Sequence, residues 1–137
     1  MSDVKITVEE RCGRQCASSG SAWEPIMGYS RAVRTGPLVA VTGTVGVNAD
    51  GAYSESLADQ TARSLQIVGA ALESLGASLE QVFRTRMYVT DVSKWEEVAR
   101  VHGKVFGDIR PATTIVEVAR LIDDAAQIEI EADAYVG

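Results

Sequence analysis

The sequence predicts an α+β fold in which two helices cover one face of a mixed β-sheet, in two layers. Residues 54–75 and 94–106 repeat apolar side chains at the spacing of a helix. Residues 127–134 alternate apolar and polar side chains, which is typical of a strand with one buried face. With the other expected strands, the order is β, β, α, β, α, β, β. The 137 residues are enough for a single domain, residues 1–137, with its own core.

The N-terminal segment is the least regular part of the sequence. Residues 4–11 predict a short strand, whereas residues 12–22 are rich in Ser, Gly and Cys and predict a loop. We interpret residues 1–22 as a mobile segment. Its Cys12 and Cys16 form a C-x-x-x-C pattern without a third cysteine, so a zinc site with four ligands is not predicted. Two reduced thiols are the expected state.

A hairpin follows, with strands at residues 31–35 and 38–45 joined by a Gly-Pro turn. Gly43 interrupts the second strand. A lone glycine in a strand marks a bulge or the close approach of another group. Residues 48–51, Asn-Ala-Asp-Gly, then predict a turn before the first helix.

The first helix, residues 54–75, has signals at both ends. Ser56 and Asp59 resemble a capping box, and Gly76 suits the position just after a helix. Spacings of three and four place five side chains on one face. They are Thr61, Leu65, Val68, Leu72 and Leu75.

A strand and the second helix come next. Residues 82–89 alternate between a basic and aromatic row and an apolar row. The first row is Arg84, Arg86 and Tyr88, and the second is Phe83, Thr85, Met87 and Val89. Ser93 and Glu96 predict a capping box for the helix at residues 94–106. Its apolar stripe is Trp95, Val98, His102 and Val105. We expect His102 to be a packed side chain rather than a catalytic base.

Two strands end the sequence. The first lies within residues 110–121, where Pro111 suits a strand entrance. Val116 and Val118 share its predicted core face, opposite Thr113, Ile115 and Glu117. The second strand has one apolar row and one row of three carboxylates. The carboxylates are Glu129, Glu131 and Asp133.

The two helices leave the other face of the sheet uncovered, and we expect that face to be a subunit interface. The acidic row of the last strand can pair with Arg84 and Arg86 in a neighbouring strand. We assign Val39, Ile115 and Tyr88 to the same face. Where the charges are incompletely paired, a polar cleft between subunits is expected.

Charge and hydropathy exclude several kinds of partner. A net charge of −6 argues against nucleic-acid binding, which relies on clustered Lys and Arg. No apolar run is long enough to span a membrane, and residues 1–5 do not begin a signal peptide. A cytoplasmic protein is expected, and the charge says little about small-molecule substrates.

Several motifs carry a family resemblance. In order, they read GYSRAV, VAVTGTVGVNADG, RTRMYVTDVSKWEEV, RPATTIVEVARL and IEIEADA. Together they resemble the RidA/YjgF family, the reactive-intermediate deaminases, over residues 24–134. The resemblance implies a chorismate-mutase-like fold and a homotrimer with clefts between neighbouring subunits. It also implies hydrolysis of enamines and imines to a keto acid and ammonia, without a metal or organic cofactor.

The resemblance also assigns roles to single residues. Glu129 would orient the attacking water or manage its proton, as the catalytic group. Gly43 would offer backbone in the cleft wall, and Tyr29 would line the pocket. Ser93 stands where relatives often have asparagine.

One position departs from the family pattern. Thr113 stands where the best-known deaminases have an arginine that holds the substrate carboxylate, and a neutral hydroxyl cannot replace that cation. Ile115 stands where relatives often have cysteine and makes the cleft more apolar. Either Arg86, our first hypothesis, or Arg31 supplies the positive charge, or the substrate has no carboxylate at that position.

Two alternatives stay open at this stage. The alternative role for Arg86 is an ion pair with Glu117, Glu129 or Glu131. For the whole chain, the first alternative is a divergent deaminase. The second is a trimer that binds a small metabolite, or serves a partner enzyme, without turnover of its own.

Overall fold

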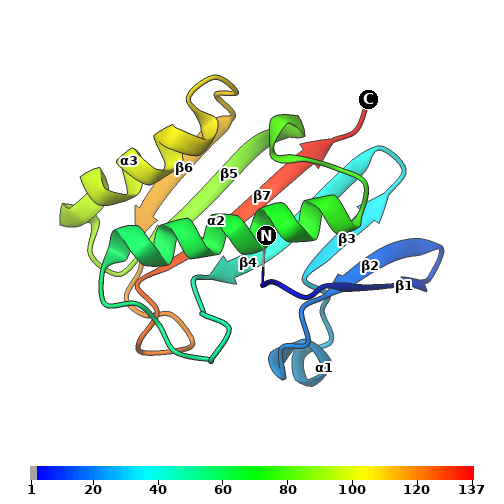
Figure 1. Cartoon of the computed structure of the whole chain (residues 1–137), viewed down its shortest axis with the longest axis horizontal. Coiled ribbons are helices and arrows are strands. Elements are labelled where there is room, and N and C mark those ends of the chain that lie inside the picture. Colours follow the sequence, from blue (N-terminus) through cyan, green and yellow to red (C-terminus); the bar gives the residue numbers. More distant parts are fainter. Residues whose placement is uncertain (1–2) are drawn as a thin grey trace.

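The computed structural model describes residues 3–137, which form one seven-stranded sheet and three α-helices (Figure 1). The strands are β1 (Thr7–Arg11), β2 (Arg14–Ser18), β3 (Ala32–Thr35), β4 (Leu38–Val45), β5 (Val82–Val89), β6 (Ala112–Glu117) and β7 (Ile128–Tyr135). The helices are α1 (Trp23–Met27), α2 (Leu57–Ser74) and α3 (Trp95–Phe106), with short 3-10 turns at Leu79–Gln81 and Val92–Lys94. Met1 and Ser2, which begin the segment predicted to be mobile, lie outside the described residues.

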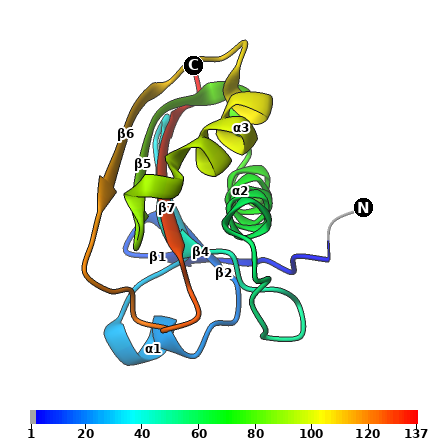
Figure 2. The same ribbon diagram turned by 90° about the vertical axis from the view of Figure 1, so that its left-hand side faces the viewer.

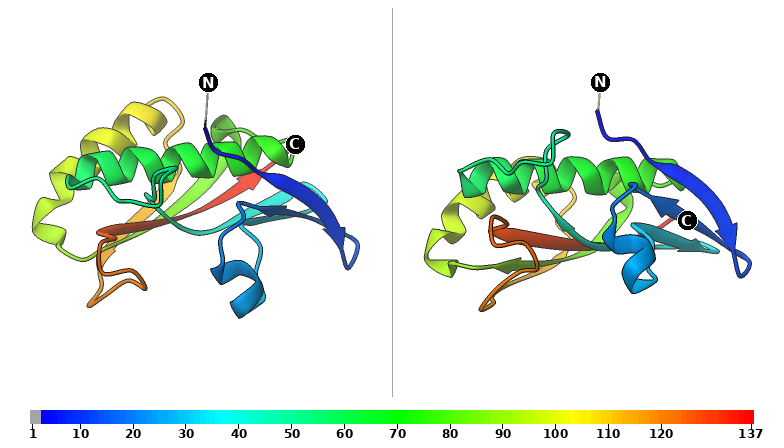
Figure 3. Two further views of the ribbon diagram at one scale, coloured as in Figure 1. Left: turned by 60° about the horizontal axis from the view of Figure 1, so that its bottom comes forward. Right: turned by 90° about the horizontal axis from the view of Figure 1, so that it is seen from below.

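The sheet is mixed and is covered by helices on one face. Its strand order is β1-β2-β3-β4-β7-β5-β6, in which β5 and β6 pair in parallel and the other neighbours are antiparallel. Helix α3 supplies the crossover that a parallel pair requires. Figure 2 shows α2 and α3 on the same side of the strands, and Figure 3 shows the short α1 on the opposite side. The predicted two-layer α+β architecture is confirmed.

The core lies between α2 and the centre of the sheet, where β7 runs between β4 and β5. The apolar row of β7 is at most 1% exposed, as its alternation predicts. This row is Ile128, Ile130, Ala132 and Ala134. The ends of α2 also agree with prediction. Ser56 accepts a hydrogen bond from the Asp59 N–H at 3.0 Å, and Gly76 follows the helix with a φ of +77°.

The N-terminal segment is a β-hairpin, so the loop predicted over residues 12–22 is wrong for Arg14–Ser18. Strand β2 pairs with β1 on one side and with β3 on the other. Cys16 and Ala17 are buried in the core at 4% and 0% exposure. The sequence does not reveal β2, because its two buried residues are adjacent and do not alternate with exposed ones. Its neighbour β1 is exposed along its whole length and adds no burial pattern. The expected strand at residues 4–11 is confirmed for Thr7–Arg11.

Three local predictions in and after β5 are wrong. A β-bulge around Phe83 turns that side chain outward, and it is 47% exposed instead of joining the apolar row. Ser93 does not cap α3, which begins after Lys94 without a side-chain cap. Ser93 lies instead in the preceding 3-10 turn, where the Asp91 carboxylate accepts hydrogen bonds from its N–H and hydroxyl at 3.1 and 2.6 Å. Trp95 is 52% exposed, since the stripe that α3 buries begins one turn later with Val98.

The faces of β6 are the reverse of those predicted. Ile115 packs against the core, whereas Val116 is 42% exposed. Val39 is 1% exposed within the core, so neither Ile115 nor Val39 belongs to the uncovered face. Tyr88 does lie on that face, beside the acidic row of β7. The buried face of β6 was predicted wrongly because β6 is an edge strand with apolar side chains on both faces.

His102 is a packed side chain, as its place on the helix predicts. Its ring centroid lies 4.6 Å from that of Phe106, and its Nε2 lies 3.0 Å from the Thr85 hydroxyl. Burial lowers the pKa of His102, which favours the neutral imidazole.

Candidate functional site

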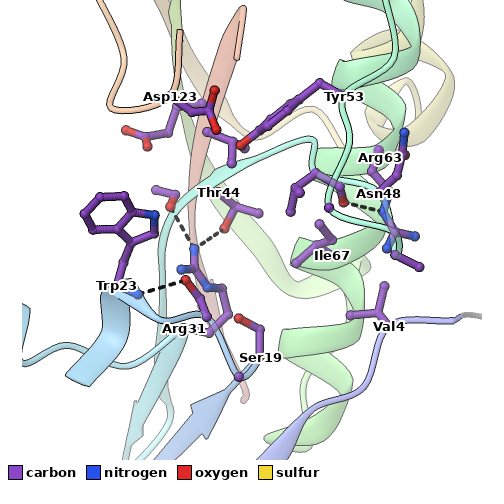
Figure 4. A pocket seen from close by; sticks show the side chains of 18 of the residues that line it. Val4, Ser19, Trp23, Arg31, Thr44, Asn48, Tyr53, Arg63, Ile67 and Asp123 are labelled. Carbon is purple, nitrogen blue, oxygen red and sulfur yellow. Dashed lines mark hydrogen bonds between the residues drawn. The ribbon is translucent and has the colours of Figure 1, made fainter. Parts of the chain in front are cut away.

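A cavity of about 690 Å³ opens beside the second half of β4 and reaches the N-terminal half of α2. We call it the Glu129 pocket. Tyr29, Gly43 and Glu129, three residues to which the family resemblance assigns roles, all line it. Figure 4 shows Arg31 and Thr44 in its centre, with Tyr53 and Asp123 at one end. The structure therefore brings three of the seven predicted site residues together within one chain.

Gly43 makes room for the Glu129 side chain. A Cβ at position 43 would lie 2.9 Å from both Cδ and Oε2 of Glu129, closer than real contacts allow. The pairing of β4 with β7 also shifts register between Val41 and Thr44. Both meanings of a strand glycine, a bulge and a close approach, apply at this position.

Glu129 is a partly buried carboxyl group whose proton affinity is increased by its surroundings. Burial, and then the negative charge of Glu131, raise its pKa above the usual range, while Arg31 acts in the opposite direction. A carboxyl group tuned upward in this way is a stronger base than an ordinary carboxylate, which suits a group that accepts a proton and returns it.

Arg31 is the buried cation of the pocket, with its side chain 8% exposed. Its Nη1 donates to the Gly43 carbonyl at 2.8 Å and to the Thr44 hydroxyl at 3.2 Å. Its Nη2 donates to the Tyr29 hydroxyl at 3.2 Å, and the guanidinium lies 5.4 Å from the centre of that ring. The guanidinium thus fixes the backbone of β4 and the Tyr29 side chain together.

Sequence reasoning placed Arg31 second to Arg86 as the cation of the site. The main partner of Arg31 is a backbone carbonyl on another strand, which no side-chain pattern reveals. One signal was present: Tyr29 and Arg31 are two residues apart, so in extended chain they point to the same side.

Glu24 is the buried counterion of Arg31. It is 5% exposed, and one carboxylate oxygen lies 3.8 Å from Nε of Arg31. Ser18 Oγ, Ser19 Oγ and the Ser19 N–H donate to the carboxylate at 2.6, 2.7 and 3.2 Å. Burial alone would raise the pKa of Glu24, but the serine hydrogen bonds and the Arg31 charge outweigh it and lower the pKa. Glu24 is therefore ionised and ties the loop before β3 to the pocket.

We expect Glu24→Gln to destabilise the protein by roughly 3 kcal/mol near neutral pH, because it leaves a buried guanidinium without a counterion. Since the folded pKa lies below the ordinary value of 4.5, the wild-type advantage is complete above that pH. It is lost as the pH falls through the lower, folded pKa. Urea unfolding at several pH values measures both effects.

The exposed pair of Glu9 and Arg11 provides the control for this experiment. Glu9→Gln should shift the urea midpoint hardly at all, because exposed ion pairs contribute little. Equal midpoints for Glu24→Gln and wild type near neutral pH would contradict the role given to Glu24.

Arg86 does not line the Glu129 pocket. Its Nη1 lies 3.2 Å from Asp133 and 3.5 Å from Glu131, on the uncovered face of the sheet. The ion pair weighed as its alternative role is confirmed for Glu131. Of the two arginines weighed as the cation of the site, it is Arg31, the second choice, that lines the pocket.

Ser93, Thr113 and Ile115 lie away from the Glu129 pocket within one chain. Ser93 is exposed and bonded to Asp91. The Thr113 hydroxyl lies 2.8 Å from that of Thr85, and Ile115 packs against the core. Their predicted place in a cleft requires a second copy of the chain and stays a prediction.

Two features are not found between residues 3 and 137. No group of three or more potential metal-binding side chains is close enough together to hold an ion. No helix in this range has the length and apolar character needed to span a membrane.

Cys12 is exposed and Cys16 is buried, and neither forms a disulfide.

Comparison with known proteins agrees with this fold and pocket. A family model described as endoribonuclease L-PSP matches residues 19–136. The structure of Rv2704 from Mycobacterium tuberculosis, described as a member of the YjgF/YER057c/UK114 family, is 51% identical. Its TM-score is 0.84, over 90% of this chain and 99% of that one.

Two relatives show how broad the family is. The protein SCO2049 of Streptomyces coelicolor is 34% identical over 122 residues, which are 87% of this chain and 90% of that protein. Reactive Intermediate Deaminase A, chloroplastic, of Arabidopsis thaliana is 33% identical over 105 residues, 75% of this chain and 56% of that protein. Because the family model matches most of the chain and the predicted fold is confirmed, this chain belongs to the endoribonuclease L-PSP family, also described as YjgF/YER057c/UK114.

Proposed function

We propose that the chain is an imine deaminase that works at the Glu129 pocket. The observation that carries the proposal is a partly buried carboxyl group, with raised pKa, held over a glycine inside a cavity of ligand size. The family contains a relative named as a reactive intermediate deaminase, which agrees with this chemistry.

The reaction needs only water and one group that moves protons. In the proposed sequence, a water oxygen adds to the carbon of the protonated imine while Glu129 accepts a proton from the water. The protonated Glu129 then returns that proton to the nitrogen. The carbon–nitrogen bond breaks and its electron pair leaves with the nitrogen as ammonia, while the carbinol hydroxyl gives its proton to Glu129 and the electron pair of that O–H bond completes the carbonyl. The proton on Glu129 then passes to ammonia, which leaves as ammonium. Arg31 contributes by fixing the Gly43 backbone and Tyr29 around the reacting atoms.

The proposal includes a trimer. Leu38, Phe83 and Tyr135 are apolar side chains that are 47%, 47% and 54% exposed, and partners of the same chain would cover them. Thr113 and Ser93 of a neighbouring copy would then complete the pocket. Sedimentation as a single 14.6 kDa chain would contradict this part of the proposal.

A second candidate is a trimer that binds a small metabolite without turnover. It is favoured by the hydrogen bonds of Arg31, whose Nη1 is fully occupied by protein groups. It is also favoured by the neutral Thr113 at the position of the family's carboxylate-binding arginine. This candidate predicts that a ligand raises the melting temperature but that no imine disappears faster.

The deciding experiment uses imines made in situ. Amino-acid oxidase and amine oxidase supply imines with and without a carboxylate, and semicarbazide traps the imine that remains. We expect purified wild-type chain to decrease semicarbazone formation and to release ammonia faster than the spontaneous reaction does. If the chain accelerates hydrolysis of none of the imines, whether from neutral, aromatic or acidic amino acids or from amines, the function is that of the second candidate, a binding protein without turnover.

A further inference from the structure

Each arginine of the Glu129 pocket is paired with a carboxylate of the protein itself, Arg31 with Glu24 and Arg63 with Asp3. Arg31 donates through Nη1 to Gly43 and Thr44 and through Nη2 to Tyr29. Its Nε has no hydrogen-bond partner, but it is buried beside Glu24 at 3.8 Å and is therefore out of reach of a ligand. Arg63 forms an ion pair with Asp3 and donates to the Val47 carbonyl at 2.9 Å and to Gln66 at 2.9 Å.

The third cation of the lining, Lys5, is solvent-exposed on the N-terminal segment. An exposed ammonium is strongly hydrated and screened by salt. Among the residues that the structure describes, the pocket therefore has no desolvated cation available to hold a substrate carboxylate.

The end of the pocket around Tyr53 is instead acidic. Asp123 lies beside Tyr53 in Figure 4, and Glu129 lines the same cavity. Burial, and then the negative charges of Asp123 and Glu129, raise the pKa of the Tyr53 hydroxyl. The half-buried Glu129 provides the larger share of this negative field, and the exposed, salt-screened Asp123 provides the smaller share. A field of this sign attracts a cation more than an anion.

Apolar side chains complete the walls. Trp23 comes from α1, Ile67 from α2 and Ile122 from the segment before β7. Trp23 and Ile122 are 49% and 65% exposed, so their apolar surface is open to a ligand. A volume of about 690 Å³ is ample for an aromatic or long aliphatic group.

We propose that the substrate of the Glu129 pocket is an imine without a carboxylate, carried on an aromatic or long aliphatic body and bound as its iminium cation. The inference rests on the proposed function, because it names the substrate class of the same site. The iminium takes up one water and yields an aldehyde or ketone and an ammonium ion, so atoms and charge balance. A reaction that oxidises primary amines is the class that must supply such a substrate.

The test compares matched pairs that differ in the carboxylate. Phenethylamine with amine oxidase and phenylalanine with amino-acid oxidase each give an imine with the same aromatic group. We expect the amine-derived imine to be hydrolysed with a kcat/KM about tenfold higher or more. Equal or faster hydrolysis of the carboxylated imine would overturn the substrate class and leave the deaminase function intact.

A binding measurement separates the two proposals. Benzylammonium should raise the melting temperature, and 3-phenylpropanoate should not. If neither imine is turned over but benzylammonium alone stabilises the protein, the preference for cations stands and the deaminase function fails. Stabilisation by the propanoate alone, or by neither probe, overturns the preference.

Asp123→Asn tests the source of the preference. The asparagine oxygen can still accept the Ala125 N–H, which Asp123 accepts at 2.9 Å, so the turn is preserved. We expect the preference for the cationic substrate to fall about threefold to tenfold. Asp124→Asn is the matched control, because Asp124 is 83% exposed, pairs with Arg120 and does not line the pocket. Equal effects of the two substitutions would overturn the assignment to Asp123.

Discussion

Glu129→Gln is expected to decrease imine hydrolysis by about a hundredfold or more while the fold is kept. Glutamine has nearly the shape of glutamate, so it fits over Gly43, but it cannot accept a proton from water or return one to nitrogen. Turnover measured by semicarbazide trapping, together with the melting temperature, shows whether chemistry and stability separate.

The same substitution should stabilise the protein near neutral pH. The pKa of Glu129 is raised in the folded state, so the folded protein binds this proton more tightly than the unfolded chain does. Wild type therefore loses stability as the pH rises from the ordinary value of 4.5 through the folded pKa. The advantage of Glu129→Gln should be complete above this window and absent below 4.5. A higher melting temperature for wild type at neutral pH would contradict this account.

Two further variants test the same carboxyl group. Gly43→Ala places a Cβ against the flexible end of Glu129, so we expect turnover to fall while the melting temperature changes little. Glu131→Gln removes a charge that raises the pKa of Glu129, so the acid limb of the pH–rate profile should move to lower pH. Full activity in both Glu129→Gln and Gly43→Ala would exclude Glu129 as the proton-transfer group.

Elements whose signals lie within their own sequence were predicted well. The alternation of β7 identified its buried row, and Ser56 and Gly76 marked the ends of α2. Strand β2 was missed because its burial depends on pairing with β3, which lies further along the chain. Phe83 was misplaced for a similar reason, since the bulge that turns it outward exists only in the pairing with β7.

The residues of the candidate site divide in the same way: those with a local sequence signal were predicted, and those defined by contacts between segments were not. Glu129 was found from a family motif, and Gly43 was singled out as a glycine inside a strand. Arg31 was undervalued because its partners are a backbone carbonyl and hydroxyl groups on separate segments. Thr113 could be named from its motif, but its position relative to Glu129 depends on assembly, which one sequence does not describe. Local periodicity thus predicted elements, whereas contacts between elements needed coordinates.

Gly46→Ala is expected to destabilise the protein by about 3 kcal/mol or more, which lowers the melting temperature by roughly 10 °C. Gly46 follows β4 directly under α2. A Cβ at position 46 would clash with the backbone of Gln60. It would lie 2.8 Å from the Gln60 Cα and carbonyl carbon, and closer still to the carbonyl oxygen. Backbone cannot swing aside as the end of a side chain can, so α2 has to move away from β4.

That movement would also break a buried hydrogen-bond network. The Gln60 amide nitrogen donates to the carbonyls of Ser54 and Ala125 at 2.8 and 3.0 Å, and its oxygen accepts the Gln127 N–H at 2.8 Å. Gln60 is 1% exposed, so each of these groups would lose its partner without gaining water. The damage would extend to the segment before β7 and so to Glu129.

Gly103→Ala is the matched control, because the same atom is added inside α3 with nothing within 4 Å of it. Alanine is the better helix former, so this variant should gain about 0.5–1 kcal/mol. Thermal and urea unfolding of both variants beside wild type measure the two effects. The two variants should change the free energy of unfolding in opposite directions, although each adds the same methyl group. The reason is that only at position 46 would the added Cβ clash with backbone atoms. A melting temperature of Gly46→Ala equal to that of wild type would mean that α2 does not press on β4 at this point.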